Sequence, residues 1–201
     1  MIKAFLFDYD GVITKGVDVS IPAQRLAKRA DISVDEASDI IKIIWNDYST
    51  GKSSKDEMWS RIEMELGKHI ADHKRDIWFG WNDLKPINSM LELIHKLKAK
   101  NYPVGLVSNV FQETAELIRL NGGYENFDFT ILSCEVGARK PDPLMYQSAM
   151  KYLSNIKANE VMFFDDRQHC IDGAKEFGLN TFLVTNHNEL IMQVNRIVKQ
   201  R

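Results

Sequence analysis

Phe7-Asp8-Tyr9-Asp10-Gly11-Val12-Ile13-Thr14 follows the apolar run Ile2–Phe7 near the start of the chain. The run predicts a buried strand, and Gly11 predicts a turn directly after it. Residues i and i+2 of a strand point to the same side, so Asp8 and Asp10 would face one spot at its carboxyl end. Open α/β sheets place their ligand sites at that end. One carboxylate could be a nucleophile that becomes an aspartyl phosphate, and the other the acid that protonates the leaving group.

Short apolar runs separated by helix-sized segments recur along the chain. Each run is strand-sized and mostly unalternating, which is typical of strands buried on both faces of a parallel sheet. We therefore predict the α/β class, with a three-layer, Rossmann-like core of parallel strands covered by helices. The later runs are Pro103–Val107, Phe127–Leu132, Val161–Phe164 and Thr181–Val184.

The gap between the first two predicted strands is the anomaly, because it spans about ninety residues where a crossover needs only a dozen or more. Amphipathic helices are expected there, two of them behind capping boxes. They lie at Pro22–Ala30, after Ser33-Val34-Asp35-Glu36, after Ser54-Lys55-Asp56-Glu57 and around Lys68–Trp78. The predicted division is a catalytic core of residues 1–15 and 85–201 with an inserted all-helical cap of residues 16–84.

Three further polar segments follow later predicted strands, at the edge of the sheet that would carry Asp8. They are Ser108-Asn109, the stretch Gly137–Pro143 with Lys140 in it, and Asp165-Asp166. Each has an ordinary interpretation, namely a helix cap, a solvated loop lysine and a polar strand end, and the first aspartate pair also suits a plain turn. Their shared position at strand ends favours a catalytic site.

In this order the segments resemble the four motifs of phosphatases in the haloacid dehalogenase superfamily. Asp8–Val12 is similar to motif one, Ser108-Asn109 to motif two, Lys140–Pro143 to motif three, and Phe163–Arg167 to motif four. The helical insertion resembles the C1 cap of the dehalogenase-like branch, which includes small sugar-phosphate phosphatases. One departure is Cys170, which stands where motif four often has Asn.

The resemblance implies a magnesium site. A phosphate ester dianion repels a carboxylate nucleophile, and Mg²⁺ can offset that charge because it prefers oxygen ligands in octahedral geometry. The family pattern implies ligands from the Asp8 carboxylate, the Asp10 backbone carbonyl and Asp166. It places Asp165 nearby, as a water-mediated ligand or as a hydrogen-bond acceptor behind the ligands.

The same resemblance assigns phosphate binding to Ser108, Asn109 and Lys140. Ser108 would donate a hydrogen bond to a phosphoryl oxygen, with the amide of Asn109 alongside. Lys140 would place a positive charge beside Asp8 and stabilise charge in the transition state. Asp10 would protonate the leaving oxygen and then take a proton from the water that hydrolyses the aspartyl phosphate.

Aromatic residues of the predicted cap could line a substrate pocket or form the core of a small helical bundle. Helical spacing favours the core for Trp59, Trp78 and Trp81. We expect Trp45 and Tyr48 to be the exceptions that face the substrate.

The predicted function is Mg²⁺-dependent hydrolysis of a small phosphorylated metabolite, such as a sugar phosphate, through an aspartyl-phosphate intermediate. Asp10 favours phosphate chemistry over dehalogenation, because a halide leaving group needs no proton. Two alternatives stay open. One is a phosphosugar mutase of the same family, and the other is a receiver-like module that takes phosphate on an aspartate as a signal.

Composition argues against other classes of partner. The 26 basic and 28 acidic residues give a formal net charge of -2, and no basic cluster is long enough for nucleic-acid or membrane-surface binding. No apolar run approaches the roughly 18 residues of a membrane span, and the start of the chain has no signal-peptide cleavage pattern. We therefore predict a cytoplasmic protein that binds a small metabolite and neither nucleic acid nor a membrane.

Overall fold

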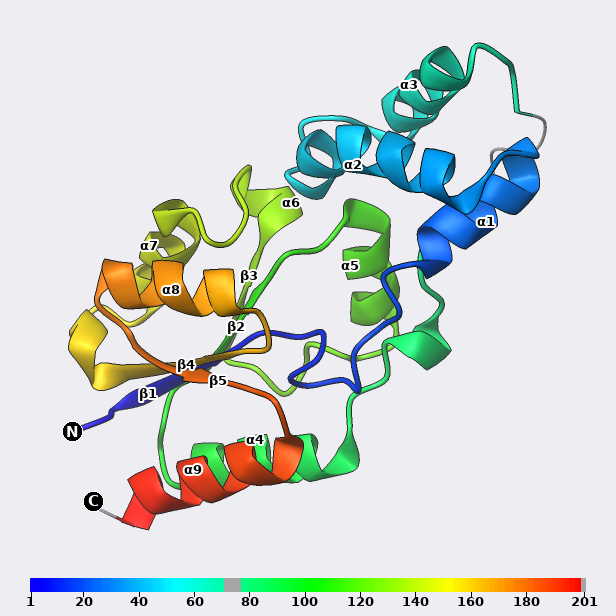
Figure 1. Ribbon diagram of the computed structural model, residues 1–201. Coiled ribbons are helices and arrows are strands. Elements are labelled where there is room, and N and C mark those ends of the chain that lie inside the picture. Colours follow the sequence, from blue (N-terminus) through cyan, green and yellow to red (C-terminus); the bar gives the residue numbers. More distant parts are fainter. Residues whose placement is uncertain (71–76, 200–201) are drawn as a thin grey trace.

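The computed structural model describes residues 1–70 and 77–199 (Figure 1). Its strands form one parallel sheet with the order β3-β2-β1-β4-β5. They are β1 (Ala4–Phe7), β2 (Val104–Ser108), β3 (Phe129–Leu132), β4 (Val161–Asp165) and β5 (Asn180–Leu183). Each predicted strand is therefore present, and its observed ends lie within two residues of the predicted ones.

Helices cover both faces of the sheet (Figure 1). They are α4 (Asn88–Ala99) and α9 (His187–Lys199) on one face, and α7 (Pro143–Tyr152) and α8 (Gln168–Phe177) on the other. Phe5 and Phe7 of β1 pack in one buried cluster with residues of α4 and α9, whereas Ala4 and Leu6 pack in another with residues of α7 and α8. Because both faces of β1 are buried, its sequence is a continuous apolar run. The predicted three-layer α/β fold is confirmed.

A unit of helices lies beside this core, between β1 and β2 in the sequence (Figure 1). It contains α1 (Ile21–Ala30), α2 (Val34–Ser49) and α3 (Lys55–Leu66). Ser33 and Ser54 cap α2 and α3 as predicted, since each side chain accepts a hydrogen bond from the N–H three residues later. The apolar faces of the helices form their own buried cluster, which Phe111 of the core joins. The helix predicted around Lys68–Trp78 falls mainly outside the described residues.

The chain enters and leaves this insertion at one place. The Ile87 N–H donates to the Ile13 carbonyl oxygen over 2.9 Å, and the Tyr9 hydroxyl donates to the Leu84 carbonyl oxygen over 3.0 Å. These bonds hold the turn after β1 against the segment that returns from the helices. The insertion is thereby anchored beside the carboxyl end of β1.

A buried hydroxyl joins the insertion to the core at a second place. Ser133, which begins the short helix α6 (Ser133–Val136), is fully buried. Its Oγ donates to the Ser49 carbonyl oxygen at the end of α2 over 2.6 Å and accepts from the Val110 N–H over 2.8 Å. Gly51 lies close by at φ +67, and a Cβ there would collide with the Cys134 carbonyl oxygen. The two backbones are therefore in close contact here.

Candidate active site

The carboxyl end of β1 lies where the order of the strands reverses. β2 and β3 lie on one side of β1, and β4 and β5 lie on the other. Such a switch point opens a crevice in which α/β proteins bind ligands. Asp8 directly follows β1, and Asp165 is the last residue of the neighbouring β4. Because Phe7 pairs with Phe164, the two aspartates lie side by side.

Three carboxylates gather at this crevice, from Asp8, Asp165 and Asp166. One oxygen of each lies within 4.8 Å of the others. Lys140 reaches into the cluster, and its side chain is only 1% exposed. Its Nζ lies 2.8 Å from Asp8 Oδ1 and 2.7 Å from Asp165 Oδ2. The lysine therefore offsets part of the buried negative charge.

Burial shifts the protonation of these groups. Burial raises the pKa of Asp8 to about 7, because the attraction of Lys140 offsets only part of the desolvation. For Lys140, burial lowers the pKa, but the carboxylates of Asp165 and Asp8 outweigh it and raise the pKa above its ordinary value. Partial burial, and then repulsion from Asp165, raise the pKa of Asp166. One lysine does not balance three carboxylates, which favours a bound cation.

The donor set fits Mg²⁺, which prefers oxygen ligands. Asp8, Asp165 and Asp166 are the side chains that would hold the ion. Gly11 leaves room for this arrangement, since it has φ +75 and an added Cβ would lie 2.5 Å from Asp166 Oδ2. Ligation by the Asp10 backbone carbonyl stays a prediction from the family resemblance.

The Asp10 carboxylate is held in a fixed orientation beside the cluster. Its Oδ1 accepts hydrogen bonds from the Thr14 hydroxyl over 3.0 Å and from the Val17 N–H over 3.1 Å. The Thr14 oxygen in turn accepts from the N–H groups of Gly11 and Gly16. The turn after β1 therefore positions a carboxylate that could transfer a proton.

Ser108 and Asn109 lie at the end of β2 and line the same cavity as Asp8. The Asn109 side chain is bound to the backbone of Lys140. Its Oδ1 accepts from the Lys140 N–H over 2.8 Å, and its Nδ2 donates to the Lys140 carbonyl oxygen over 3.1 Å. The carboxamide thus positions the lysine loop, and the phosphate contact predicted for Asn109 would come from its backbone N–H.

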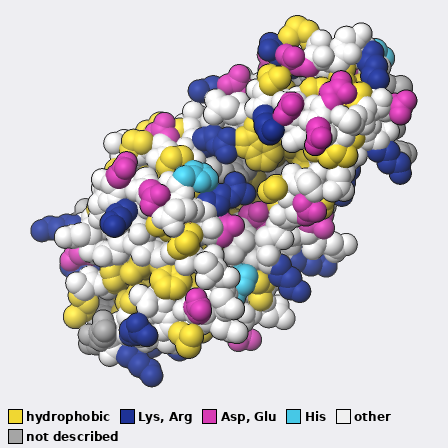
Figure 2. Space-filling view, in the orientation of Figure 1, with side chains coloured by type: hydrophobic (Ala, Val, Ile, Leu, Met, Phe, Trp, Pro, Cys, Tyr) yellow, Lys and Arg dark blue, Asp and Glu magenta, His cyan; other side chains and the backbone are white. Residues whose placement is uncertain are grey.

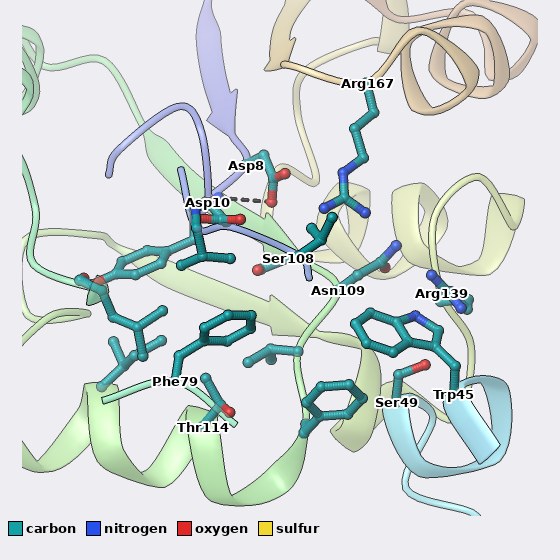
Figure 3. Close-up of a pocket in the computed structure, with 17 residues that line it drawn as sticks. Asp8, Asp10, Trp45, Ser49, Phe79, Ser108, Asn109, Thr114, Arg139 and Arg167 are labelled. Carbon is teal, nitrogen blue, oxygen red and sulfur yellow. Dashed lines mark hydrogen bonds between the residues drawn. The ribbon is translucent and has the colours of Figure 1, made fainter. Parts of the chain in front are cut away.

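The cavity opens between the core and the helical insertion (Figure 3). Asp8, Asp10 and Ser108 come from the core, whereas Trp45 and Ser49 come from α2. Much of the remaining wall is apolar and includes Val17, Val19, Phe79, Leu84, Val110, Phe111 and Ile118. Figure 2 shows Lys and Arg side chains gathered at the hollow between the two parts, close to acidic ones.

The cap aromatics divide largely as expected. Trp45 lines the cavity, and Trp59 and Trp78 are buried in the core of the insertion. Trp81 is instead partly buried against the cluster of the sheet core. The expectation for Tyr48 is wrong. Tyr48 is only 2% exposed, and its ring packs against those of Trp78 and Phe111, with ring centroids 5.6 and 4.9 Å away. Packing against these rings turns Tyr48 away from the cavity.

Two arginines that the sequence analysis left without a role also line the cavity. Figure 3 shows Arg167 reaching toward Ser108, and Arg139 beside Trp45. Burial, and then the positive charge of Arg167, lower the pKa of Arg139. Their place in the sequence could have indicated a role, because Arg139 directly precedes Lys140 and Arg167 directly follows the Asp165-Asp166 pair.

Comparison with known proteins decides the family. The sequence model of the family described as haloacid dehalogenase-like hydrolase matches residues 2–178. This chain is a haloacid dehalogenase-like hydrolase. The resemblance drawn from the four motifs is confirmed, and the chain is an enzyme of the hydrolase class.

Relatives of this hydrolase include phosphatases of similar length. It is 24% identical to validoxylamine A 7'-phosphate phosphatase from Streptomyces hygroscopicus subsp. limoneus, over 99% of this chain and 94% of that one. It is 27% identical to D-ribitol-5-phosphate phosphatase from Bacteroides thetaiotaomicron, over 92% and 93%. A haloacid dehalogenase-family enzyme from the latter organism, solved with magnesium and inorganic phosphate, shares the fold. It has a TM-score of 0.75 and 24% identity over 91% of this chain and 94% of that one.

Proposed function

We propose that this hydrolase is a Mg²⁺-dependent phosphomonoesterase that acts on a small phosphorylated metabolite. The observation that carries the proposal is the buried contact of Lys140 with Asp8 and Asp165, beside the oriented carboxylate of Asp10. A carboxylate nucleophile, a cation and a proton donor then adjoin one cavity. The phosphatase relatives support the same assignment.

Asp8 supplies the nucleophile in the proposed reaction. Its carboxylate attacks phosphorus, and the bond from phosphorus to the leaving oxygen breaks as an aspartyl phosphate forms. Lys140, 2.8 Å from Asp8, stabilises the negative charge of the transition state, and Ser108 donates a hydrogen bond to a phosphoryl oxygen. When bound by Asp8, Asp165 and Asp166, Mg²⁺ supplies the positive charge that lets a phosphate dianion approach these carboxylates.

Asp10 moves the proton in both halves of the reaction. Its carboxyl group protonates the leaving oxygen, and the resulting carboxylate takes a proton from the water that attacks the aspartyl phosphate. Inorganic phosphate leaves, and Asp8 is regenerated. The hydrogen bonds from Thr14 and Val17 keep the Asp10 carboxylate oriented through both steps.

The proposal includes residues 16–84 as a cap over a catalytic core of residues 1–15 and 85–201. Its support is the separate buried cluster of the inserted helices and the position of Trp45 and Ser49 in the cavity wall. A cap in this position would exclude water and select the leaving group.

Family membership favours hydrolysis over a receiver-like module. A phosphosugar mutase would use the same residues, and it would be revealed by turnover that needs catalytic amounts of a sugar bisphosphate. Across residues 1–70 and 77–199, every helix is too short or too polar to cross a membrane. The cytoplasmic location and the lack of a nucleic-acid partner stay predictions from the sequence.

Hydrolysis of p-nitrophenyl phosphate tests the proposed function. The wild-type enzyme should release nitrophenol with Mg²⁺ and lose this activity in EDTA. Asp8→Asn should abolish hydrolysis while circular dichroism shows an intact fold. The control Asp39→Asn changes a side chain that is 75% exposed and should keep wild-type activity. Full activity of Asp8→Asn, or equal rates in EDTA, would contradict the mechanism.

A further inference from the structure

Arg139 and Arg167 are two positive charges to which the proposed chemistry gives no role. Of the 17 residues that line the cavity, the charged ones are Asp8, Asp10, Arg139 and Arg167. Within the described part of the chain, neither guanidinium makes a salt bridge or a hydrogen bond. Both are partly buried, so each has lost some contact with water. The neighbouring Asp166 carboxylate attracts Arg167, whereas among the described residues no carboxylate is paired with Arg139.

The two arginines occupy different places in the cavity (Figure 3). Arg167 follows the paired aspartates and reaches toward Ser108, where the transferring phosphoryl group would bind. Arg139 lies instead beside Trp45 of the insertion, with its Cζ 6.0 Å from the centroid of the indole ring. This contact holds the guanidinium at the cap side of the cavity. Arg139 is therefore placed to meet the leaving group of the substrate.

Electrostatics favours an anion at Arg139. Two guanidiniums in one partly buried cavity repel each other, and a polar group removed from water without a partner is destabilising. The phosphoryl group can accept hydrogen bonds from Arg167. Apolar side chains and Ser49 surround the cap side, so an anion for Arg139 would have to come from the substrate. The planar fork of arginine pairs two N–H donors with a carboxylate or a phosphate.

We infer that the substrate carries a second anionic group on its leaving group, and that Arg139 binds it. The inference rests on the proposed phosphatase function. It defines the substrate class as phosphorylated hydroxy acids and bisphosphates, including those of sugars, in preference to monophosphates with an uncharged leaving group. Arg139 would then determine specificity, whereas Asp8 and Asp10 perform the chemistry.

Three substrates with the same three-carbon chain separate the possibilities. They are propyl phosphate, which has an uncharged leaving group, 3-phosphooxypropanoate, which has a carboxylate, and propane-1,3-diyl bisphosphate. We expect wild-type kcat/KM to be about 10- to 100-fold higher for at least one charged substrate than for propyl phosphate, as for a hydrogen-bonded ion pair. The preferred charged substrate identifies the anion as a carboxylate or a phosphate.

Substitution of Arg139 should remove this preference. Arg139→Met should lower kcat/KM for the preferred charged substrate at least about tenfold more than for propyl phosphate, mainly through KM. Arg139→Lys should keep part of the preference because it retains the charge. The matched control is Arg119→Met, since Arg119 also lies 6.0 Å from an aromatic centroid, that of Tyr124, but outside the cavity. It should keep the full wild-type preference.

Three outcomes would overturn the inference. Equal wild-type kcat/KM for all three substrates would show that no second anion is recognised, even if Arg139→Met fails to fold. An equal loss on all three substrates in Arg139→Met would give Arg139 a structural or phosphoryl-binding role instead. If the wild-type enzyme with Mg²⁺ hydrolyses p-nitrophenyl phosphate but none of the three substrates, the inference is overturned and the proposed function stands; if it hydrolyses neither, both are overturned. Hydrolysis of propyl phosphate without preference leaves the proposed function intact.

Discussion

Replacing Lys140 by methionine should strongly destabilise the metal-free protein at about pH 8. The lysine is 2% exposed, and its Nζ lies 2.8 and 2.7 Å from the carboxylates of Asp8 and Asp165. Methionine fills a similar volume but leaves both carboxylates buried without their cation. Removing one partner from a buried ion pair costs about 3 to 5 kcal/mol, and we expect a loss of that size in the free energy of unfolding.

The loss should shrink at low pH. The pKa of Asp8 rises from 3.8 to about 7 on folding, so between these values the folded state binds more protons than the unfolded state. Stability from this group is therefore fully present below about pH 4 and falls as the pH rises toward 7. Asp8 is already largely neutral at about pH 5 in the wild type, and it stays neutral there without Lys140, because its pKa should then rise further. The loss there should be only about 1.5 to 3 kcal/mol, from the broken contact with Asp165.

Urea denaturation followed by tryptophan fluorescence measures this difference. Wild type and Lys140→Met are compared in EDTA at about pH 5 and about pH 8. The control Lys151→Met changes an exposed lysine on α7 and should alter stability by less than about 0.5 kcal/mol. An equal loss at both pH values, or none at the higher one, would refute the idea that uncompensated buried carboxylates cause it.

Other predictions concern the metal site and the cap. In Gly11→Ala the new Cβ would collide with Asp166, so Mg²⁺ binding measured by calorimetry should weaken at least about tenfold. The control Gly67→Ala also lies at positive φ (+63) but has open space around it, and it should leave Mg²⁺ binding unchanged. Asp8→Asn removes a buried carboxylate that is charged only at the higher pH, so in EDTA it should raise the free energy of unfolding by about 1 to 3 kcal/mol above pH 7 and by less near pH 4. Equal increases at the two pH values in calorimetry would contradict this prediction. Ser133→Ala should lower the free energy of unfolding by about 1 to 3 kcal/mol in urea titrations. Unchanged stability would mean that the buried Ser133 hydroxyl does not stabilise the contact between the insertion and the core.

Local patterns in the sequence were sufficient for the elements of the fold. The unbroken apolar run of β1 predicted a strand buried on both faces, and all of its residues are buried. Ser54 and Glu57 form the predicted capping box because they bond to backbone groups within the same turn. The unusual length of the segment between β1 and β2 predicted an insertion, since a crossover helix alone would not occupy it. The signals for the strand and the capping box depend on residues close together in the chain, and the insertion is read from the distance between two such signals.

The candidate site could be located from the sequence because parallel strands end at one edge of a sheet. Asp8, Ser108 and Asp165 each stand at a strand end, so their proximity follows from the topology. The position of Lys140 after a predicted strand placed it at the same edge, but its role came only from the family resemblance, because a loop lysine has no local signal for burial. Its contacts with Asp8 and Asp165 depend on how the loop after α6 packs, with Asn109 holding its backbone.

The sequence by itself determined the strands, the helix caps, the insertion and the edge of the sheet at which chemistry would occur. Only the tertiary structure decided that Trp45 faces the cavity while Tyr48 packs inside the insertion, and that Arg139 and Arg167 share one cavity. The physical reason is the range of the interactions. Backbone hydrogen bonding and apolar periodicity act within a few residues, whereas burial and side-chain direction depend on segments that meet only after folding.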